Sequence, residues 1–279
     1  MNSLLLVFSD LDGSLLDHYS YNFEAAREQL EVLRQAAVPL ILASSKTRAE
    51  IEPLRAALGN GHPFIVENGA AVFIPEGYFA EPPADTVPAD GYRVRQWALP
   101  RAHWLQLLAR LEGEYGGEFT SFHAAGSDGI QALTGLDATA AARANQRDFS
   151  EPVRWLGDAP RKAAFIAELQ AAGATVQQGG RFLAVAGDCD KGRALRWLRD
   201  LYAAREPARD VHDIAIGDSA NDCPMLEVAE TALLIRSPVH AFPALQRSEG
   251  IWHSSACGPA GWAEGIDRWL QRYHIATKE

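Results

Sequence analysis

Cysteine is scarce in this sequence, and its scarcity excludes two kinds of architecture. The 279 residues include three cysteines, Cys189, Cys223 and Cys257, which lie far apart and form no C-x-x-C pair. A disulfide framework or a cysteine zinc site needs closely patterned cysteines, so we expect neither. The eight histidines lack the H-E-x-x-H spacing of a zinc hydrolase. A reducing, cytoplasmic environment fits this composition best.

Long apolar runs and an excess of positive charge are also missing. No apolar run approaches the roughly 18 residues that span a bilayer, so we expect no membrane association. The N-terminal apolar run is short and reaches Asp10 where a signal peptide would have its cleavage site. The formal net charge of −10 argues against a nucleic-acid-binding protein, which needs a basic face. An anionic substrate must therefore meet a local cluster of cations.

The sequence does contain a short apolar strand that ends in two carboxylates. The run Leu4–Phe8 is typical of a buried strand, and Asp10 and Asp12 follow it. Side chains two residues apart on an extended chain point to the same side, and Gly13 then lets the backbone turn away. Converging carboxylates repel each other unless a cation lies between them, and a hard divalent ion suits this position. An isolated D-x-D-G is equally compatible with a solvated acidic loop.

The same arrangement recurs along the chain. Further strands are predicted to end at Ser44 and, in an E-N-G turn, at Asn68. Strands that alternate with helices are typical of an α/β fold with a doubly wound, parallel, Rossmann-like sheet, and ligands bind such sheets at the carboxyl ends of the strands. Pro53 is expected to kink or break the helix that contains it. The predicted elements are helices over 23–36 and 47–58 and strands over 38–43 and 63–66.

This alternation is interrupted after residue 80. The proline-rich segment 81–88 is typical of a linker. Residues 81–187 then show a mixed α/β pattern that includes a hairpin turning at Gly179-Gly180, and the first pattern resumes at 188. We therefore predict a catalytic core made of residues 1–80 and 188–279, with residues 81–187 inserted as an α/β cap. Hinges are expected near 77–88 and 187–190.

Four short motifs now lie in a fixed order. They are D-L-D-G-S at 10–14, S-S-K-T at 44–47, D-K-G at 190–192 and G-D-S-A-N-D at 217–222. The first two follow predicted strands, the third opens a helix predicted from Lys191 to about residue 204, and the fourth follows a strand predicted over 211–216. Together they resemble the four motifs of the haloacid dehalogenase superfamily of phosphohydrolases. The resemblance covers about residues 1–80 and 188–279.

The resemblance implies a role for each motif residue. Asp10 corresponds to the nucleophile that takes the phosphoryl group as an aspartyl-phosphate, and Asp12 to the acid that protonates the leaving oxygen and then activates water. Ser44 would donate a hydrogen bond to the phosphoryl oxygens, and Lys191 would neutralise them and hold Asp10. A carboxylate suits the nucleophile's task because it is already ionised at neutral pH.

The resemblance also implies a magnesium ion. Asp10, Asp218 and the backbone carbonyl of Asp12 would bind Mg²⁺, with Asp222 in the metal site and Asn221 supporting it. Other roles stay open for several of these residues. Ser44 and Asn68 could be turn residues, Lys191 a solvated helix lysine, and Asp222 a residue that favours the first turn of its helix.

One subgroup of the superfamily is particularly similar. The runs S-S-K-T-R-A-E, E-N-G-A-A-V-F-I-P and N-Q-R-D-F-S-E-P resemble those of the mannosyl-3-phosphoglycerate phosphatases. The resemblance implies a small phosphorylated sugar or glycerate as substrate. Ser14 departs from the superfamily, which more often has threonine there, but it keeps the hydroxyl. The candidate substrate-binding residues are Ser45, Lys46, Asn68, Arg147 and Arg181, and a guanidinium group matches a carboxylate or a phosphate.

Three alternatives remain open at this point. The chain could be another sugar-phosphate phosphatase or a phosphomutase of the same superfamily. It could also be an inactive phosphosugar-binding module, although the presence of both Asp10 and Asp12 argues against that. The sequence does not indicate the oligomeric state.

Overall fold

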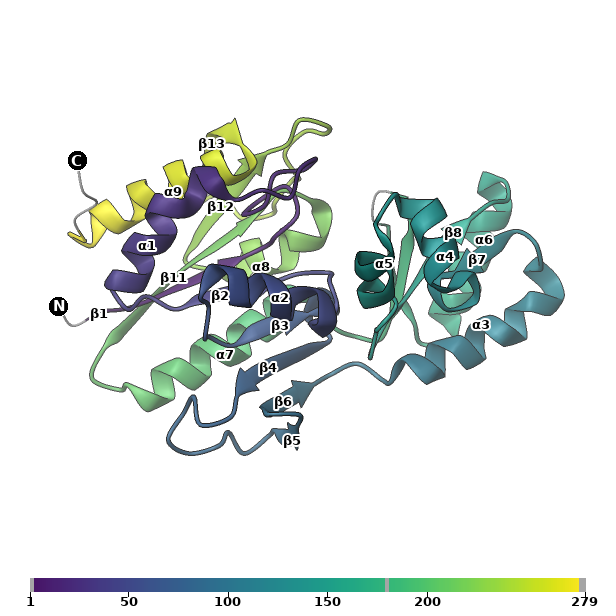
Figure 1. The fold of residues 1–279 in the computed structure, drawn as a ribbon, viewed down its shortest axis with the longest axis horizontal. Coiled ribbons are helices and arrows are strands. Elements are labelled where there is room, and N and C mark those ends of the chain that lie inside the picture. Colours follow the sequence, from purple (N-terminus) through teal and green to yellow (C-terminus); the bar gives the residue numbers. More distant parts are fainter. Residues whose placement is uncertain (1–2, 179–180, 276–279) are drawn as a thin grey trace.

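A computed structural model of the chain describes residues 3–178 and 181–275. It shows two bodies, a large core on the left of Figure 1 and a smaller cap on the right. The turn predicted at Gly179-Gly180 lies outside the described residues. None of the helices in the described part of the chain combines the length and the apolar character that crossing a bilayer requires.

The core is built on a nine-stranded sheet within the described ranges. In the order in which they lie side by side, its strands are β13 (Ile251–Cys257), β12 (Thr231–Arg236), β11 (Asp210–Gly217), β1 (Ser3–Ser9), β2 (Leu40–Ala43), β3 (Phe64–Val66), β4 (Ala71–Pro75), β6 (Tyr92–Gln96) and β5 (Val87–Ala89). The strands from β13 to β3 are parallel, and β4, β6 and β5 add an antiparallel edge. The expected doubly wound α/β core is confirmed.

Helices cover both faces of this sheet, and successive apolar residues of β1 pack on opposite faces. Leu5 and Val7 pack on the face covered by α1 (Arg27–Gln35), α2 (Arg48–Leu58) and α9 (Gly258–Arg272). Leu4, Leu6 and Phe8 pack on the opposite face, under α7 (Lys191–Arg205) and α8 (Cys223–Val228). Both faces of β1 are buried, which is why its sequence is a continuous apolar run.

Two details of the core differ from expectation. The helix predicted from residue 23 begins as a short 3₁₀ helix, η1 (Glu24–Ala26), before α1. Helix α2 continues through Pro53 rather than ending there. A reciprocal capping box between Thr47 and Glu50 anchors its first turn, and Ile51 is fully buried. These contacts stabilise the helix despite the hydrogen bond that proline cannot donate.

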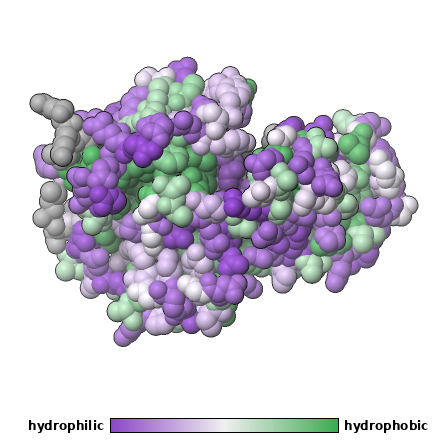
Figure 2. Space-filling view, in the orientation of Figure 1, coloured by the Kyte–Doolittle hydropathy of each residue, from purple (hydrophilic) through white to green (hydrophobic). Residues whose placement is uncertain are grey.

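The cap contains a separate antiparallel sheet. Its strands lie in the order β7 (Phe119–Ser121), β8 (Glu151–Trp155), β10 (Leu183–Ala186) and β9 (Thr175–Gln178). Helices α3 (Arg101–Tyr115) and α6 (Ala159–Ala171) share an apolar core with this sheet, and α4 (Phe122–Thr134) and α5 (Ala138–Ala144) pack on each other. Figure 2 shows that hydrophilic residues cover most of the visible face, and that its largest hydrophobic region lies on the core.

The boundary between the two bodies lies later in the chain than expected. Strands β5 and β6 fall within 81–187, yet β6 pairs with β4 and extends the core sheet to residue 96. The cap's own elements begin with α3, and the strands at 87–89 and 92–96 belong to the core sheet. Strand β5 is a short edge strand that contains Pro88, and all its residues are exposed. It therefore lacks the alternation of apolar and polar residues by which a strand is recognised in a sequence.

Candidate active site

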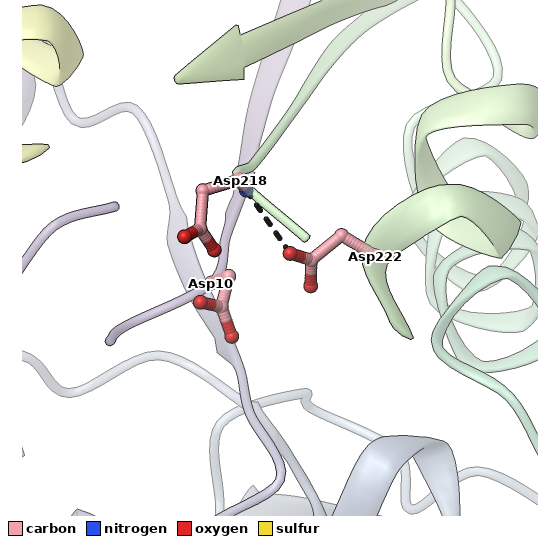
Figure 3. Close-up of side chains that lie close together, drawn as sticks. All are labelled: Asp10, Asp218 and Asp222. Atoms are coloured by element: carbon pink, nitrogen blue, oxygen red, sulfur yellow. Dashed lines mark hydrogen bonds between the residues drawn. The ribbon is translucent and has the colours of Figure 1, made fainter. Parts of the chain in front are cut away.

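The site begins at the carboxyl ends of the two central parallel strands. The backbone N–H of Asp10 donates to the carbonyl of Ile216 at 2.8 Å, which continues the pairing of β1 with β11 beyond the strand. Asp10 is 5% exposed, and Asp218 follows β11 at 4% exposure. The topology therefore places two carboxylates from distant parts of the chain side by side, as Figure 3 shows.

Lys191 joins this pair from the first turn of α7. Its ammonium group is fully buried and donates to Oδ1 of Asp10 and to Oδ1 of Asp222, both at 2.6 Å. Asp190 caps the helix by accepting from the backbone N–H of Arg193. Burial lowers the pKa of Lys191, but the two carboxylates outweigh this and raise it above its ordinary value. Lys191 is therefore a fixed positive charge in the site.

Asp222 organises the loop after β11. It ends the 3₁₀ helix η3 (Ala220–Asp222), and its Oδ2 accepts from the backbone N–H groups of Asp218 and Ser219 at 3.1 and 3.0 Å. Because its two oxygens face Lys191 and the loop backbone, Asp222 fixes the position of Asp218. Gly217 makes this approach possible, since a Cβ there would lie 2.4 Å from the Cβ of Asp222.

The three carboxylates meet the geometric needs of a hard cation. Oxygen atoms of Asp10, Asp218 and Asp222 lie within 4.8 Å of one another, and all three residues are buried. Burial, followed by the charge of Asp222, raises the pKa of Asp10 well above its ordinary value, although Lys191 opposes this. Burial and Asp222 raise the pKa of Asp218 to about 6. One ammonium does not balance three carboxylates, and carboxylate oxygens are the donors that Mg²⁺ prefers, so these residues fit that ion.

Asp12 lies beside the cluster in a different environment. Its side chain is 40% exposed, and its Oδ2 is 2.8 Å from Nζ of Lys46. Its Oδ1 is enclosed and has no hydrogen-bond donor in the described part of the chain. Asp12 and Glu50 raise the pKa of Lys46 although burial opposes this, so Lys46 carries a positive charge at the rim. A carboxylate with an unused oxygen next to Asp10 can give or accept a proton.

The loops after β2 and β3 complete the rim. Ser44 is 1% exposed, and its Oγ accepts from the backbone N–H of Lys46 at 3.2 Å. Asn68 has a left-handed backbone (φ 61°), and its Oδ1 accepts from Nδ2 of Asn221 at 3.0 Å. The backbone N–H of Asn68 also donates to the backbone carbonyl of Ser44 at 2.9 Å. The structure thus brings Ser44, Lys46 and Asn68 to the edge of the sheet that carries Asp10.

Comparison with known proteins identifies the family. A family model described as haloacid dehalogenase-like hydrolase matches residues 7–81. A curated relative from Methanococcoides burtonii, a glucosyl-3-phosphoglycerate/mannosyl-3-phosphoglycerate phosphatase, is 36% identical over 94% of this chain and 95% of its own length. The chain belongs to the haloacid dehalogenase-like phosphatases. It is therefore a phosphoric monoester hydrolase, as the motifs predicted.

Solved structures of such phosphatases share the whole fold. One from Bacteroides thetaiotaomicron has a TM-score of 0.66 at 15% identity and covers 99% of this chain and 97% of its own. The sucrose-phosphatase from Synechocystis sp. PCC6803, solved with sucrose and phosphate, has a TM-score of 0.60 at 16% identity and covers 96% and 98%. The core and the cap thus match these structures together.

The two cap arginines that were predicted to bind substrate lie in different places. Arg147 reaches the core, where its side chain donates to the carbonyl of Ser45 at 2.7 Å. Arg181 remains within the cap and donates to the carbonyls of Leu133 and Thr134 at the end of α4. The structure therefore brings Arg147 and Ser45 together and leaves Arg181 bonded to α4. Substrate binding by any of these three residues stays a prediction.

Three residues near the site had not been assigned to it. Trp262 of α9 is fully buried and donates to Oγ of Ser9, which in turn donates to the backbone carbonyl of Asp10, so this core residue also holds the backbone of Asp10. Nε2 of His240 is 3.4 Å from Oδ2 of Asp218. Glu67 is buried between core and cap. His240 lies in an irregular loop that carries no sequence pattern, whereas Glu67 is part of the E-N-G turn.

Proposed function

We propose that this phosphatase hydrolyses a phosphomonoester with the help of Mg²⁺ and through an aspartyl-phosphate on Asp10. The cluster of Asp10, Lys191, Asp218 and Asp222 carries the proposal. Phosphate monoesters hydrolyse extremely slowly without a catalyst, so the site must both supply a nucleophile and balance the charge of the phosphoryl oxygens. A buried carboxylate fixed at one oxygen by Lys191, with its other oxygen free of that contact, fits the first need.

The residues of the chain divide the reaction into two steps. In the first, an oxygen of Asp10 forms a bond to phosphorus while the bond to the ester oxygen breaks, and Asp12 gives that leaving oxygen a proton. In the second, the oxygen of a water molecule bonds to phosphorus while Asp12 takes a proton from that water. The bond between phosphorus and Asp10 breaks, which releases phosphate and restores the carboxylate of Asp10. Lys191 and the hydroxyl of Ser44 would stabilise the phosphoryl oxygens throughout.

Mg²⁺ would be held by Asp10 and Asp218, with Asp222 beside them. When bound, it would neutralise negative charge on the phosphoryl group and on the carboxylates around it. The three buried carboxylates support this assignment, because they carry more negative charge than Lys191 alone balances.

The proposed substrate is mannosyl-3-phosphoglycerate or its glucosyl counterpart, a small molecule with a phosphate, a carboxylate and a sugar. The relative with 36% identity over nearly the whole chain supports it. Lys46, which contacts Asp12 at the rim, and Arg147, which contacts Ser45 between core and cap, are the proposed partners of the substrate's anionic groups. We propose that the cap closes over this substrate and excludes water. Its hinges would be the connecting segments 97–100 and 187–190. The hinge expected near 77–88 falls instead within the core, between β4 and β6. The cytoplasmic location expected from the sequence stays a prediction.

A panel of substrates tests the proposal. Phosphate release would be measured with mannosyl-3-phosphoglycerate, glucosyl-3-phosphoglycerate, sucrose phosphate, a hexose phosphate and p-nitrophenyl phosphate, each with and without Mg²⁺. We expect Mg²⁺-dependent release with the highest kcat/KM for one of the two glycerates. A clear preference for another sugar phosphate would identify a different phosphatase. Transfer of phosphate between positions of one sugar would identify a phosphomutase, and binding without release an inactive binding module.

A further inference from the structure

Glu67 of the core turn η2 (Glu67–Gly69) is bound by the cap. Its side chain is 1% exposed, although it carries a carboxylate. Its Oε1 accepts from the backbone N–H of Asp148 at 2.8 Å. Its Oε2 accepts from the N–H groups of Phe149 and Ser150 at 3.2 and 2.8 Å, and from the hydroxyl of Ser150 at 2.6 Å. Three consecutive amides and a hydroxyl thus enclose one carboxylate, as in a backbone anion site.

The cap residues just before and within this segment make three further contacts with the core. Nε of Arg147 is 3.5 Å from Oε2 of Glu67 and donates to Oγ of Ser150, while its NH2 group donates to the carbonyl of Ser45. The hydroxyl of Thr47 donates to the carbonyl of Arg143 at 3.0 Å. Glu67 is therefore the centre of a contact that joins cap residues 143–150 to the loops after β2 and β3. Charge-assisted hydrogen bonds of this kind are roughly twice as strong as neutral ones.

Glu67 is also tied to the active site through its own backbone. Glu67 and the next residue, Asn68, both have a left-handed backbone (φ 48° and 61°), which is uncommon for residues other than glycine. The N–H of Glu67 donates to the carbonyl of Lys46. The turn ends at Gly69, where a Cβ would lie 2.1 Å from the carbonyl oxygen of Asp190, beside Lys191. A turn so closely packed does not move without displacing Asn68.

We propose that Glu67 is a positioning residue that couples closure of the cap to the arrangement of the active-site rim. When the cap is closed, the anion site formed by residues 148–150 holds Glu67 and so fixes Asn68 against Asn221. When the cap opens, water replaces the cap groups that donate to Glu67. The carboxylate of Glu67 thus has hydrogen-bond donors in both conformations, cap groups in the closed one and water in the open one. The inference rests on the proposed function, because it assigns Glu67 to the closed state in which the phosphate ester reacts.

The test compares Glu67→Gln with the wild type on two substrates. Mannosyl-3-phosphoglycerate has groups that a closed cap can contact, whereas p-nitrophenyl phosphate is small and offers few. A glutamine has one acceptor oxygen and turns an N–H group toward the donors of residues 148–150. We expect kcat/KM for the glycerate to fall by about tenfold or more, and that for p-nitrophenyl phosphate by less than about threefold. The matched control is Glu76→Gln, an exposed glutamate of the core, which should behave as the wild type on both substrates.

Limited proteolysis supplies a readout that does not depend on turnover. The segments 97–100 and 187–190 connect core and cap, and Glu67→Gln should be cut there at least about threefold faster than the wild type or Glu76→Gln. Ser150→Ala removes one donor to Glu67. It should lower kcat/KM for the glycerate and speed proteolysis, each by less than Glu67→Gln does. It keeps the test decisive if Glu67→Gln does not fold.

Each outcome has a distinct meaning. Equal losses of kcat/KM on both substrates in Glu67→Gln would overturn the coupling role of Glu67. Unchanged kinetics together with unchanged proteolysis in that variant would overturn it too. If the wild type releases phosphate from p-nitrophenyl phosphate and not from the glycerate, the substrate assignment fails. The proteolysis comparison then still decides whether Glu67 holds the cap closed.

Discussion

Replacing Gly13 with alanine should impair catalysis while leaving the fold in place. Gly13 follows Asp12 with φ +84°, and an added Cβ would lie 2.5 Å from Oδ2 of Asp218 and 3.0 Å from its Cγ. Real Cβ atoms essentially never approach another atom closer than 3.0 Å, so the carboxylate of Asp218 must retreat by at least about 0.5 Å. Because Asp222 holds the backbone N–H of Asp218, this movement must come from rotation of the Asp218 side chain away from its place in the cluster.

The size of the effect follows from this displacement. Catalytic groups must be held within about 0.5 Å of their productive positions, and a displacement of about 1 Å costs on the order of 100-fold in rate. We therefore expect Gly13→Ala to lower kcat by about 10- to 100-fold and to weaken binding of Mg²⁺. The left-handed backbone adds a folding cost of about 1–2 kcal/mol for any residue with a Cβ.

Gly59→Ala is the matched control. Gly59 ends α2 with φ +61°, and nothing lies within 4 Å of the position that its Cβ would occupy. Both variants should lower the melting temperature by about 2–4 °C per kcal/mol of folding cost, because both force alanine into the same backbone region. Phosphate release at saturating substrate, with Mg²⁺ titrated, separates them. Wild-type turnover and Mg²⁺ affinity in Gly13→Ala, or an equal loss of turnover in Gly59→Ala, would refute the reasoning.

Four further predictions concern the charged cluster. Asp10→Asn should lower phosphate release by at least about 10³-fold because it removes the nucleophile, and a loss below tenfold would contradict this. Lys191→Met leaves two buried carboxylates without their partner and should cost about 3–5 kcal/mol in urea unfolding; an unchanged midpoint would oppose it. A chelator should stop turnover and Mg²⁺ restore it, and Mg²⁺ should raise the melting temperature of the wild type much more than that of Asp218→Asn. Without Mg²⁺, the pKa of Asp218 in the native state is raised to about 6, whereas an aspartate in the unfolded chain has a pKa of about 3.9. The native state therefore binds a proton on Asp218 more tightly than the unfolded chain does. Stability relative to Asp218→Asn should therefore rise as pH falls from about 6 to 4, and a fall over that range would contradict the assignment.

The core and the cluster could be predicted from the sequence because parallel sheets follow simple rules. An apolar run that ends in Asp10 or Asp218 is recognisable locally, and parallel strands bring their carboxyl ends to one edge. Lys191 was predictable for a related reason, since Asp190 and Gly192 mark the start of its helix. The structure brings these residues together as the motifs indicated, while their catalytic roles stay predictions.

The contact between core and cap was less accessible to sequence reasoning. Nothing local distinguishes Arg147, which bonds to the core, from Arg181, which bonds to the end of α4. Glu67 was visible only as part of a turn, because its partners are backbone N–H groups about 80 residues away in the chain. Such contacts depend on how two separately packed bodies meet, and no periodicity of the sequence records that. The edge strands β5 and β6 were assigned to the cap because the proline-rich segment 81–88 was interpreted as the linker that opens it, whereas both strands pair within the core sheet.

The most direct test of the account is to find the phosphoryl group on the enzyme. The wild type and Asp10→Asn would be mixed with substrate and Mg²⁺ and quenched in acid during turnover, and their peptides analysed by mass spectrometry. The account predicts a phosphorylated peptide that contains Asp10 in the wild type, lost on treatment with hydroxylamine and missing from the variant. Rapid turnover with phosphate on a different residue, or undiminished turnover by Asp10→Asn, would contradict it.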